Sequence, residues 1–103
     1  MKLNFEKGNG LVPAIIQDYR TGQALMLGFM NEEAFEKTGE SNLVHFYSRT
    51  RKKLWMKGEE SGDKLEVKEI IADCDNDTLL VKVKMLGKAV CHTGAQSCFI
   101  EKL

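Results

Sequence analysis

Residues 65–85 read LEVKEIIADCDNDTLLVKVKM and decide the fold, because they hold two strand patterns with a turn between them. In residues 65–72 the side chains at odd positions (Leu, Val, Glu, Ile) alternate with those at even positions (Glu, Lys, Ile, Ala), and residues 79–85 are rich in leucine and valine. Both patterns favour β-strands. The polar residues 75–77 predict a turn, so we expect this stretch to form a β-hairpin.

A second hairpin is predicted towards the N-terminus. Residues 12–18 (VPAIIQD) and 24–29 (ALMLGF) have the apolar content of buried strands, and residues 19–22 (YRTG) have the composition of a turn. The two hairpins together predict a mostly antiparallel β-sheet.

The chain between the hairpins predicts one short helix and one more strand. Asn31 is a suitable helix cap before two glutamates, and Gly39 predicts the end of a helix of about two turns. Residues 43–48 (LVHFYS) favour a strand, whereas residues 49–63 are polar and predict a long ordered loop. We therefore expect an α+β fold, mostly antiparallel sheet with one or two short helices.

Length and charge limit the classes of protein that fit. A chain of 103 residues predicts a single domain over residues 1–103. Fifteen basic and fifteen acidic residues cancel, which argues against a nucleic-acid or membrane partner. The N-terminus lacks a signal-peptide pattern, and no apolar run is long enough to span a bilayer, so a cytoplasmic protein is expected.

Three aspartates alternate in DCDND, at Asp73, Asp75 and Asp77. In an extended segment all three side chains would point to one side, where they favour a hard cation such as magnesium or calcium. An EF-hand is excluded, because its loop would need glycine and glutamate where this chain has Thr78 and Lys84. A solvated acidic turn is the alternative interpretation.

Three cysteines in a chain without an export signal are expected to stay reduced. Cys91 and Cys98 bracket CHTGAQSC, whose glycine allows a tight turn, so their sulfurs are candidates for one zinc ion, with Cys74 as a third thiolate. Water in the fourth position would suit hydrolysis, with His92 as the first candidate base and His45 as the second. The pattern also fits buried cysteines and a surface histidine without function.

One dense basic patch lies at residues 47–53 (YSRTRKK). Arg49 and Arg51 would share a face of an extended segment and could bind phosphate. The aromatic and polar residues that follow could hold a purine ribotide: Trp55, Lys57, Glu59 and Ser61. A solvated basic loop is the alternative.

Taken together, residues 46–62 (FYSRTRKKLWMKGEESG), 73–77 (DCDND) and 91–99 (CHTGAQSCF) resemble the phosphoribosyl-AMP cyclohydrolase family in order and spacing. The resemblance extends from about residue 11 through residue 99. It implies an enzyme of histidine biosynthesis that adds zinc-activated water to C6 of the purine ring of 1-(5-phosphoribosyl)-AMP and cleaves the N1–C6 bond. The pyrophosphohydrolase activity often fused to this family is expected from a separate protein.

The resemblance also implies an intertwined homodimer with active sites at the subunit interface. Magnesium would bind Asp73, Asp75 and Asp77. Zinc would bind Cys91 and Cys98 together with Cys74 of the partner subunit.

Two other functions fit parts of the sequence. A metal-binding or redox module without enzymatic activity would use the same cysteines for a structural zinc or as oxidant sensors. A nucleotide-binding regulatory domain would use the arginines of residues 47–53, and its affinity for AMP would survive Cys91→Ser.

Overall fold

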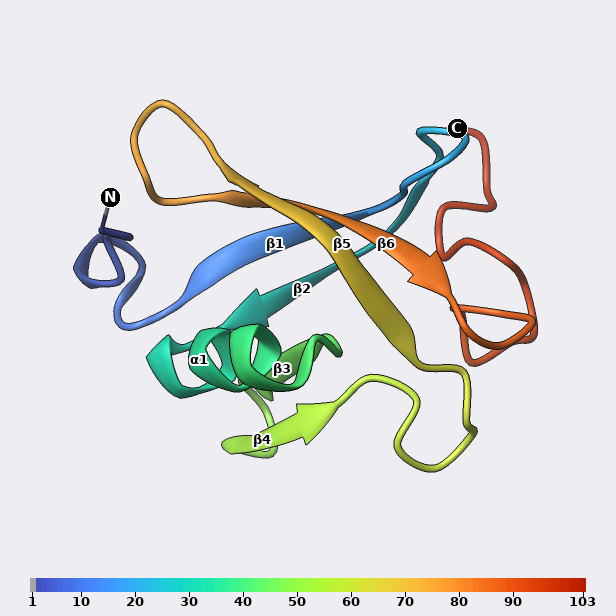
Figure 1. Cartoon of the computed structure of the whole chain (residues 1–103), viewed down its shortest axis with the longest axis horizontal. Helices are drawn as coiled ribbons and strands as arrows, with labels where there is room; N and C mark the ends of the chain where they lie inside the picture. Colours follow the sequence, from blue (N-terminus) through green and yellow to red (C-terminus); the bar gives the residue numbers. More distant parts are fainter. Residues whose placement is uncertain (1) are drawn as a thin grey trace.

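A four-stranded sheet organises the chain in the computed structural model, which describes residues 2–103. Its strands lie in the order β2-β1-β6-β5, and Figure 1 shows them crossing the molecule as one twisted layer. Both predicted hairpins are confirmed, since β1 pairs with β2 and β5 pairs with β6 in antiparallel fashion. The central pair β1–β6 is parallel. The strands are β1 (Val12–Asp18), β2 (Ala24–Met30), β5 (Leu65–Ala72) and β6 (Leu79–Met85).

The core lies on one face of this sheet. Alternate residues of β1 and β6 are fully buried, as the two-residue period of a strand requires. In Figure 1 the helix α1 (Glu32–Ser41) and a small hairpin of β3 (His45–Ser48) and β4 (Lys53–Met56) lie together against one side of the sheet. The α+β prediction with a mostly antiparallel sheet and one helix is therefore confirmed.

The helix α1 (Glu32–Ser41) begins where the sequence predicts, because the Asn31 side chain accepts a hydrogen bond of 2.8 Å from the Ala34 amide. The predicted stop at Gly39 is wrong. The helix continues to Ser41 and ends at Asn42, which adopts a left-handed conformation with φ of 63° and donates its amide to the Thr38 carbonyl. Asparagine tolerates this conformation, so it takes the capping position that glycine usually fills.

Residues 49–63 are not one long loop, so that prediction is wrong in part. Strand β4 (Lys53–Met56) pairs with β3 (His45–Ser48), in a register that sets Phe46 opposite Trp55. The two rings pack with centroids 5.3 Å apart, and this apolar contact favours pairing over an open loop. Residues 49–52 form the turn of this hairpin, and residues 57–64 remain irregular before β5.

A short 3₁₀ helix, η1 (Glu6–Gly8), precedes β1. Within residues 2–103, none of the helices has the length and apolar character needed to cross a membrane.

Candidate metal centre and active site

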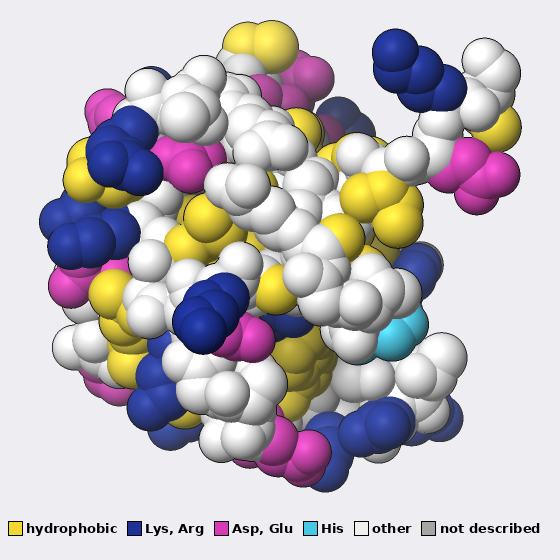
Figure 2. All heavy atoms as spheres, turned by 90° about the vertical axis from the view of Figure 1, so that its right-hand side faces the viewer, with side chains coloured by type: hydrophobic (Ala, Val, Ile, Leu, Met, Phe, Trp, Pro, Cys, Tyr) yellow, Lys and Arg dark blue, Asp and Glu magenta, His cyan; other side chains and the backbone are white. Residues whose placement is uncertain are grey.

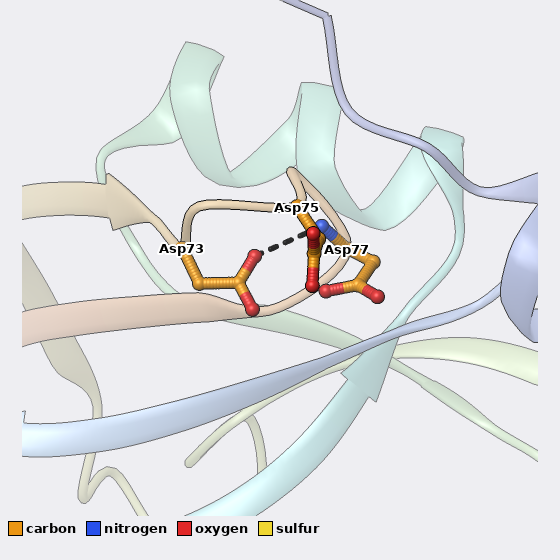
Figure 3. A group of neighbouring side chains, drawn as sticks. All are labelled: Asp73, Asp75 and Asp77. Carbon is orange, nitrogen blue, oxygen red and sulfur yellow. Dashed lines mark hydrogen bonds between the residues drawn. The ribbon is translucent and has the colours of Figure 1, made fainter.

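The three aspartates converge in the β5–β6 turn. The segment is a turn and not an extended strand, because Asn76 has a left-handed φ of 58°. Asp73 holds the turn closed, since its Oδ1 accepts hydrogen bonds from the amides of Asp77 (3.1 Å) and Thr78 (3.3 Å). Figure 3 shows the carboxylates of Asp73, Asp75 and Asp77 facing one another across this turn.

The carboxylates fit a divalent cation. One ligand oxygen from each aspartate can be chosen so that all lie within 4.8 Å of one another. Two oxygens that bind the same Mg²⁺ or Ca²⁺ ion are at most about 4–5 Å apart, which is twice the metal–oxygen distance. The cluster could therefore hold a metal ion with small side-chain movements.

A lysine from the N-terminal segment lies against this cluster. Lys7 Nζ is 2.7 Å from Asp77 Oδ2, and the hydrogen bond and charge of this pair raise the pKa of Lys7. The same hydrogen bond lowers the pKa of Asp77, and the hydrogen bond with Asp73 lowers it further. The pair keeps Asp77 ionised, which is the form that binds a cation.

Cys91 and Cys98 are brought together by a tight turn. The Gly94 amide donates to the Cys91 carbonyl at 3.0 Å, and Gly94 adopts a φ of 93° that favours glycine. The far end of the turn is fixed to β2, because the Cys98 amide donates to the Leu25 carbonyl at 2.7 Å. The buried Ser97 hydroxyl donates to the Ala24 carbonyl at 2.8 Å. As a result, the two thiols lie close enough for each to influence the pKa of the other.

The surroundings give the two thiols different acidities. The Thr93 hydroxyl donates to Cys91 Sγ at 3.2 Å and is the main reason that the pKa of Cys91 is lowered. The Cys98 thiol and the charge of Lys57 lower it further. Burial and the neighbouring Cys91 sulfur raise the pKa of Cys98. The pair therefore favours a thiolate on Cys91, which is the form that binds metal.

The third cysteine lies elsewhere in the chain. Cys74 is exposed in the aspartate turn, and Figure 1 shows that turn and the loop of residues 86–98 at opposite ends of the main sheet. Among residues 2–103, only the three aspartates form a group of three or more possible metal ligands. One copy of the chain does not bring three thiols together.

The two histidines differ in their surroundings. His92 is exposed beside the thiol pair, with its Nδ1 4.0 Å from Cys91 Sγ. His45 is half-buried on β3, with its Nδ1 2.8 Å from the Leu43 carbonyl oxygen. The position of His92 suits a base that acts beside the cysteines.

The predicted phosphate-binding arginines are exposed near the β3–β4 turn. The Arg49 guanidinium stacks on the Phe29 ring at 4.0 Å, while the Arg51 amide donates to Ser48 Oγ at 3.1 Å. Lys57 lies close enough to both cysteines for its charge to act on them. Figure 2 shows the end of the molecule that carries residues 86–98, where basic, acidic and hydrophobic side chains are interspersed and one histidine is exposed.

The remaining predicted pocket residues take part in local packing. Trp55 is half-buried against Phe46, so part of its ring is covered. Glu59 Oε1 accepts from the Met56 amide at 3.0 Å, and Ser61 Oγ accepts from the Asp63 amide at 3.1 Å. These bonds shape the loop of residues 57–64.

That loop is joined to the loop that carries the cysteines. Asp63 Oδ1 accepts a hydrogen bond of 3.1 Å from the Lys88 amide. A Cβ added at Gly87 would overlap Asp63, so the two loops lie so close together that only glycine fits at position 87. Lys57, at the start of the first loop, acts by its charge on Cys91 in the second, although the two are far apart in sequence.

Sequence reasoning missed Lys7, Thr93 and Ser97. Thr93 lies between the paired cysteines, and a hydroxyl there is a usable signal for a hydrogen bond to a thiolate. Ser97 and Lys7 act on segments distant in sequence, and no local pattern marks such contacts.

Comparison with known proteins gives one consistent family. The family model for phosphoribosyl-AMP cyclohydrolase matches residues 26–100. A phosphoribosyl-AMP cyclohydrolase of Solibacter usitatus is 56% identical over 103 residues, covering all of this chain and 82% of the relative. One of Clostridium botulinum is 54% identical over 101 residues, covering 98% of this chain and 92% of the relative. The histidine biosynthesis bifunctional protein HisIE of Bacteroides thetaiotaomicron is 60% identical over 102 residues, covering 99% of this chain and 50% of the relative.

Proposed function

Because the chain belongs to the phosphoribosyl-AMP cyclohydrolase family and is an enzyme of that class, we propose that it hydrolyses the N1–C6 bond of 1-(5-phosphoribosyl)-AMP in the cytoplasm. The product is the phosphoribosylformimino imidazole carboxamide ribotide of histidine biosynthesis. Residues 1–103 act as one cyclohydrolase domain. The observation that carries the proposal is the side-by-side placement of Cys91, Cys98, His92 and Lys57 in a chain of this family.

The Cys91 and Cys98 thiolates would hold zinc, and Asp73, Asp75 and Asp77 would hold magnesium. The donor types support this assignment, since sulfur ligands suit zinc and three carboxylates suit a hard cation. When bound at the thiols, zinc supplies a Lewis acid and a water of lowered pKa.

Side chains beside the thiols and around the β3–β4 hairpin move the proton and hold the substrate. A ring nitrogen of His92 accepts the proton of the attacking water and returns it to N1 as the N1–C6 bond breaks. Arg49, Arg51 and Lys57 bind the two phosphates, which are the strongest charges on the substrate. Trp55, with Glu59 and Ser61 in the loop that follows, shapes the pocket for the purine.

The third zinc ligand is Cys74 of the partner subunit in a homodimer. The placement of the β5–β6 turn and residues 86–98 at opposite ends of one sheet supports this assignment, because a single copy does not bring Cys74 to the other two thiols. With three protein ligands, a bound zinc would keep one position open for water, as in other catalytic zinc sites.

The outer face of the main sheet supports a homodimer. The strand register aligns Leu27, Ile15, Leu80 and Ile71 in one row across all four strands, on the face opposite the core. Leu27 is 45% exposed and Ile71 is 39% exposed, while the two residues between them are half-buried. An apolar row of this kind is typical of a subunit interface.

A two-fold axis that runs across the strands would make this face self-complementary. It reverses the direction of the strands in the second copy. The turn with Cys74 then lies over the end of the partner's sheet where the paired cysteines are, so one arrangement accounts for both the apolar row and the incomplete thiol site.

The function is tested by incubating the purified protein with phosphoribosyl-AMP and following the imidazole carboxamide product by absorbance. We expect turnover that a chelator abolishes and that zinc with magnesium restores. Stoichiometric zinc without turnover would instead favour a structural or redox module. Tight AMP binding that persists in Cys91→Ser, without turnover by the unsubstituted protein, would favour a regulatory domain.

A further inference from the structure

The N-terminal segment folds back onto the aspartate turn and brings a positive charge to it. The Asn4 amide donates to the Asn76 carbonyl at 2.7 Å, which ties residues 2–10 to this turn. Asn4 Oδ1 in turn accepts at 3.2 Å from the amide of Lys7, the middle residue of η1. The side chain of Lys7 then reaches Asp77, with Nζ 2.7 Å from Oδ2.

The Lys7 ammonium lies where a bound cation would exert its charge. Asp77 belongs to the group whose ligand oxygens lie within 4.8 Å of one another. A divalent ion binds carboxylate oxygens at about 2.0–2.6 Å, so an ammonium that stays at 2.7 Å from the same carboxylate would be strongly repelled. The ion and the ammonium therefore compete for Asp77.

Competition by Lys7 is reversible because the pair is open to solvent. The Lys7 side chain is 57% exposed and that of Asp77 is 20% exposed. An exposed ion pair is weak, so Lys7 can leave without disturbing the fold. In the absence of a metal ion its charge offsets the repulsion among the three aspartates.

We propose that Lys7 is a tethered competitor for the divalent cation at Asp73, Asp75 and Asp77, and that it releases Asp77 when the ion binds. Lys7 thereby sets the ion concentration at which the site fills. The inference rests on the proposed magnesium site and adds to it a residue that lowers its affinity.

The test measures Mn²⁺ affinity in the zinc-loaded protein, with free Mn²⁺ counted by electron paramagnetic resonance. Manganese serves as the probe because it favours the same oxygen ligands as magnesium. Lys7→Met keeps most of the side-chain length and removes the charge, and we expect it to bind Mn²⁺ about 1.5- to 5-fold more tightly at low salt. The gain should shrink in about 1 M salt, where charges are screened beyond roughly 3 Å.

Lys37→Met is the matched control, since Lys37 is an exposed lysine of α1 outside the contacts of the aspartate turn. It should leave the affinity unchanged. Equal affinities of Lys7→Met and the unsubstituted protein would overturn the inference, and so would an equal gain in Lys37→Met, which would indicate a general effect of net charge.

Asp75→Asn separates the inference from the site itself. If the unsubstituted protein binds Mn²⁺ and Asp75→Asn does not, the site exists, and the result for Lys7→Met decides the role of Lys7 alone. If Asp75→Asn binds as well as the unsubstituted protein, the proposed site and the inference fail together.

Discussion

Gly28 on β2 is expected to tolerate no side chain, because the ring of Phe46 occupies the space. A Cβ at Gly28 would lie 2.5 Å from two ring carbons of Phe46 and 3.0 Å from a third. The Phe46 ring is 1% exposed and packs against Trp55 on β4, so it cannot turn away freely. Replacing glycine by alanine in a strand normally stabilises by about 0.5–1 kcal/mol, whereas overpacking a core costs about 1–3 kcal/mol. Overpacking dominates, and we expect Gly28→Ala to lower the free energy of unfolding by about 1–2 kcal/mol.

Urea unfolding followed by circular dichroism measures this change. Gly39→Ala is the matched control, because Gly39 lies within α1 and a Cβ added there would meet nothing within 4 Å, so the substitution should stabilise by up to about 1 kcal/mol. When Phe46→Leu is combined with Gly28→Ala, part of the lost free energy of unfolding should be recovered, because leucine is smaller than the phenylalanine ring and relieves the overlap. A Gly28→Ala variant as stable as the unsubstituted protein, or a loss that Phe46→Leu does not change, would refute the packing described for β2 and β3.

Three further predictions concern the active site. In the metal-free protein, iodoacetamide should alkylate Cys91 at lower pH than Cys98, because the lowered pKa of Cys91 keeps its thiolate present as the pH falls. Thr93→Val should move the pH profile of Cys91 alkylation to higher pH. Identical pH profiles of the two cysteines by mass spectrometry would contradict the thiol assignment. Asp75→Asn should lose turnover while zinc measured by atomic absorption stays near its normal content, and loss of zinc would show that the two metal sites are not separate. His92→Ala should keep both metals and lower kcat by about 10²-fold or more, and an unchanged rate would move the role of base away from this residue.

The hairpins and the start of the helix could be predicted because local signals determine them. Alternation marks residues 65–72, and Asn31 provides a side-chain oxygen at the correct position for an N-cap. The helix end could not be placed, because Gly39 and Asn42 are both acceptable stops and the choice depends on how the chain enters β3. Strand β4 could not be predicted from its own residues, because the apolar contact that stabilises it comes from its partner β3.

The candidate site, like the fold, could be predicted where its residues lie close together in sequence and not where distant segments meet. The aspartates lie close in sequence, so one turn is enough to bring them together, although it does so by a different backbone conformation from the extended one expected. Cys98 reaches Cys91 only because Ser97 and its neighbour are fixed to β2, more than 70 residues away. Contacts between distant segments, such as Lys7 with Asp77, depend on tertiary structure that no local pattern encodes.

The proposed zinc site shared between two subunits is tested most directly by mixing two inactive variants. Cys74→Ser and Cys91→Ser each remove a ligand from both sites of their own homodimer, so each alone should lack zinc and turnover. After unfolding and refolding as an equal mixture, half of the dimers should be mixed, and each mixed dimer has one intact site.

We therefore expect the mixture to recover about a quarter of the activity and zinc content of the unsubstituted protein treated in the same way. Size-exclusion chromatography of each variant alone checks that it still folds and assembles. Recovery of neither activity nor zinc from a mixture of folded dimers would contradict a zinc site shared between subunits, as would a Cys74→Ser homodimer that keeps its zinc and its turnover.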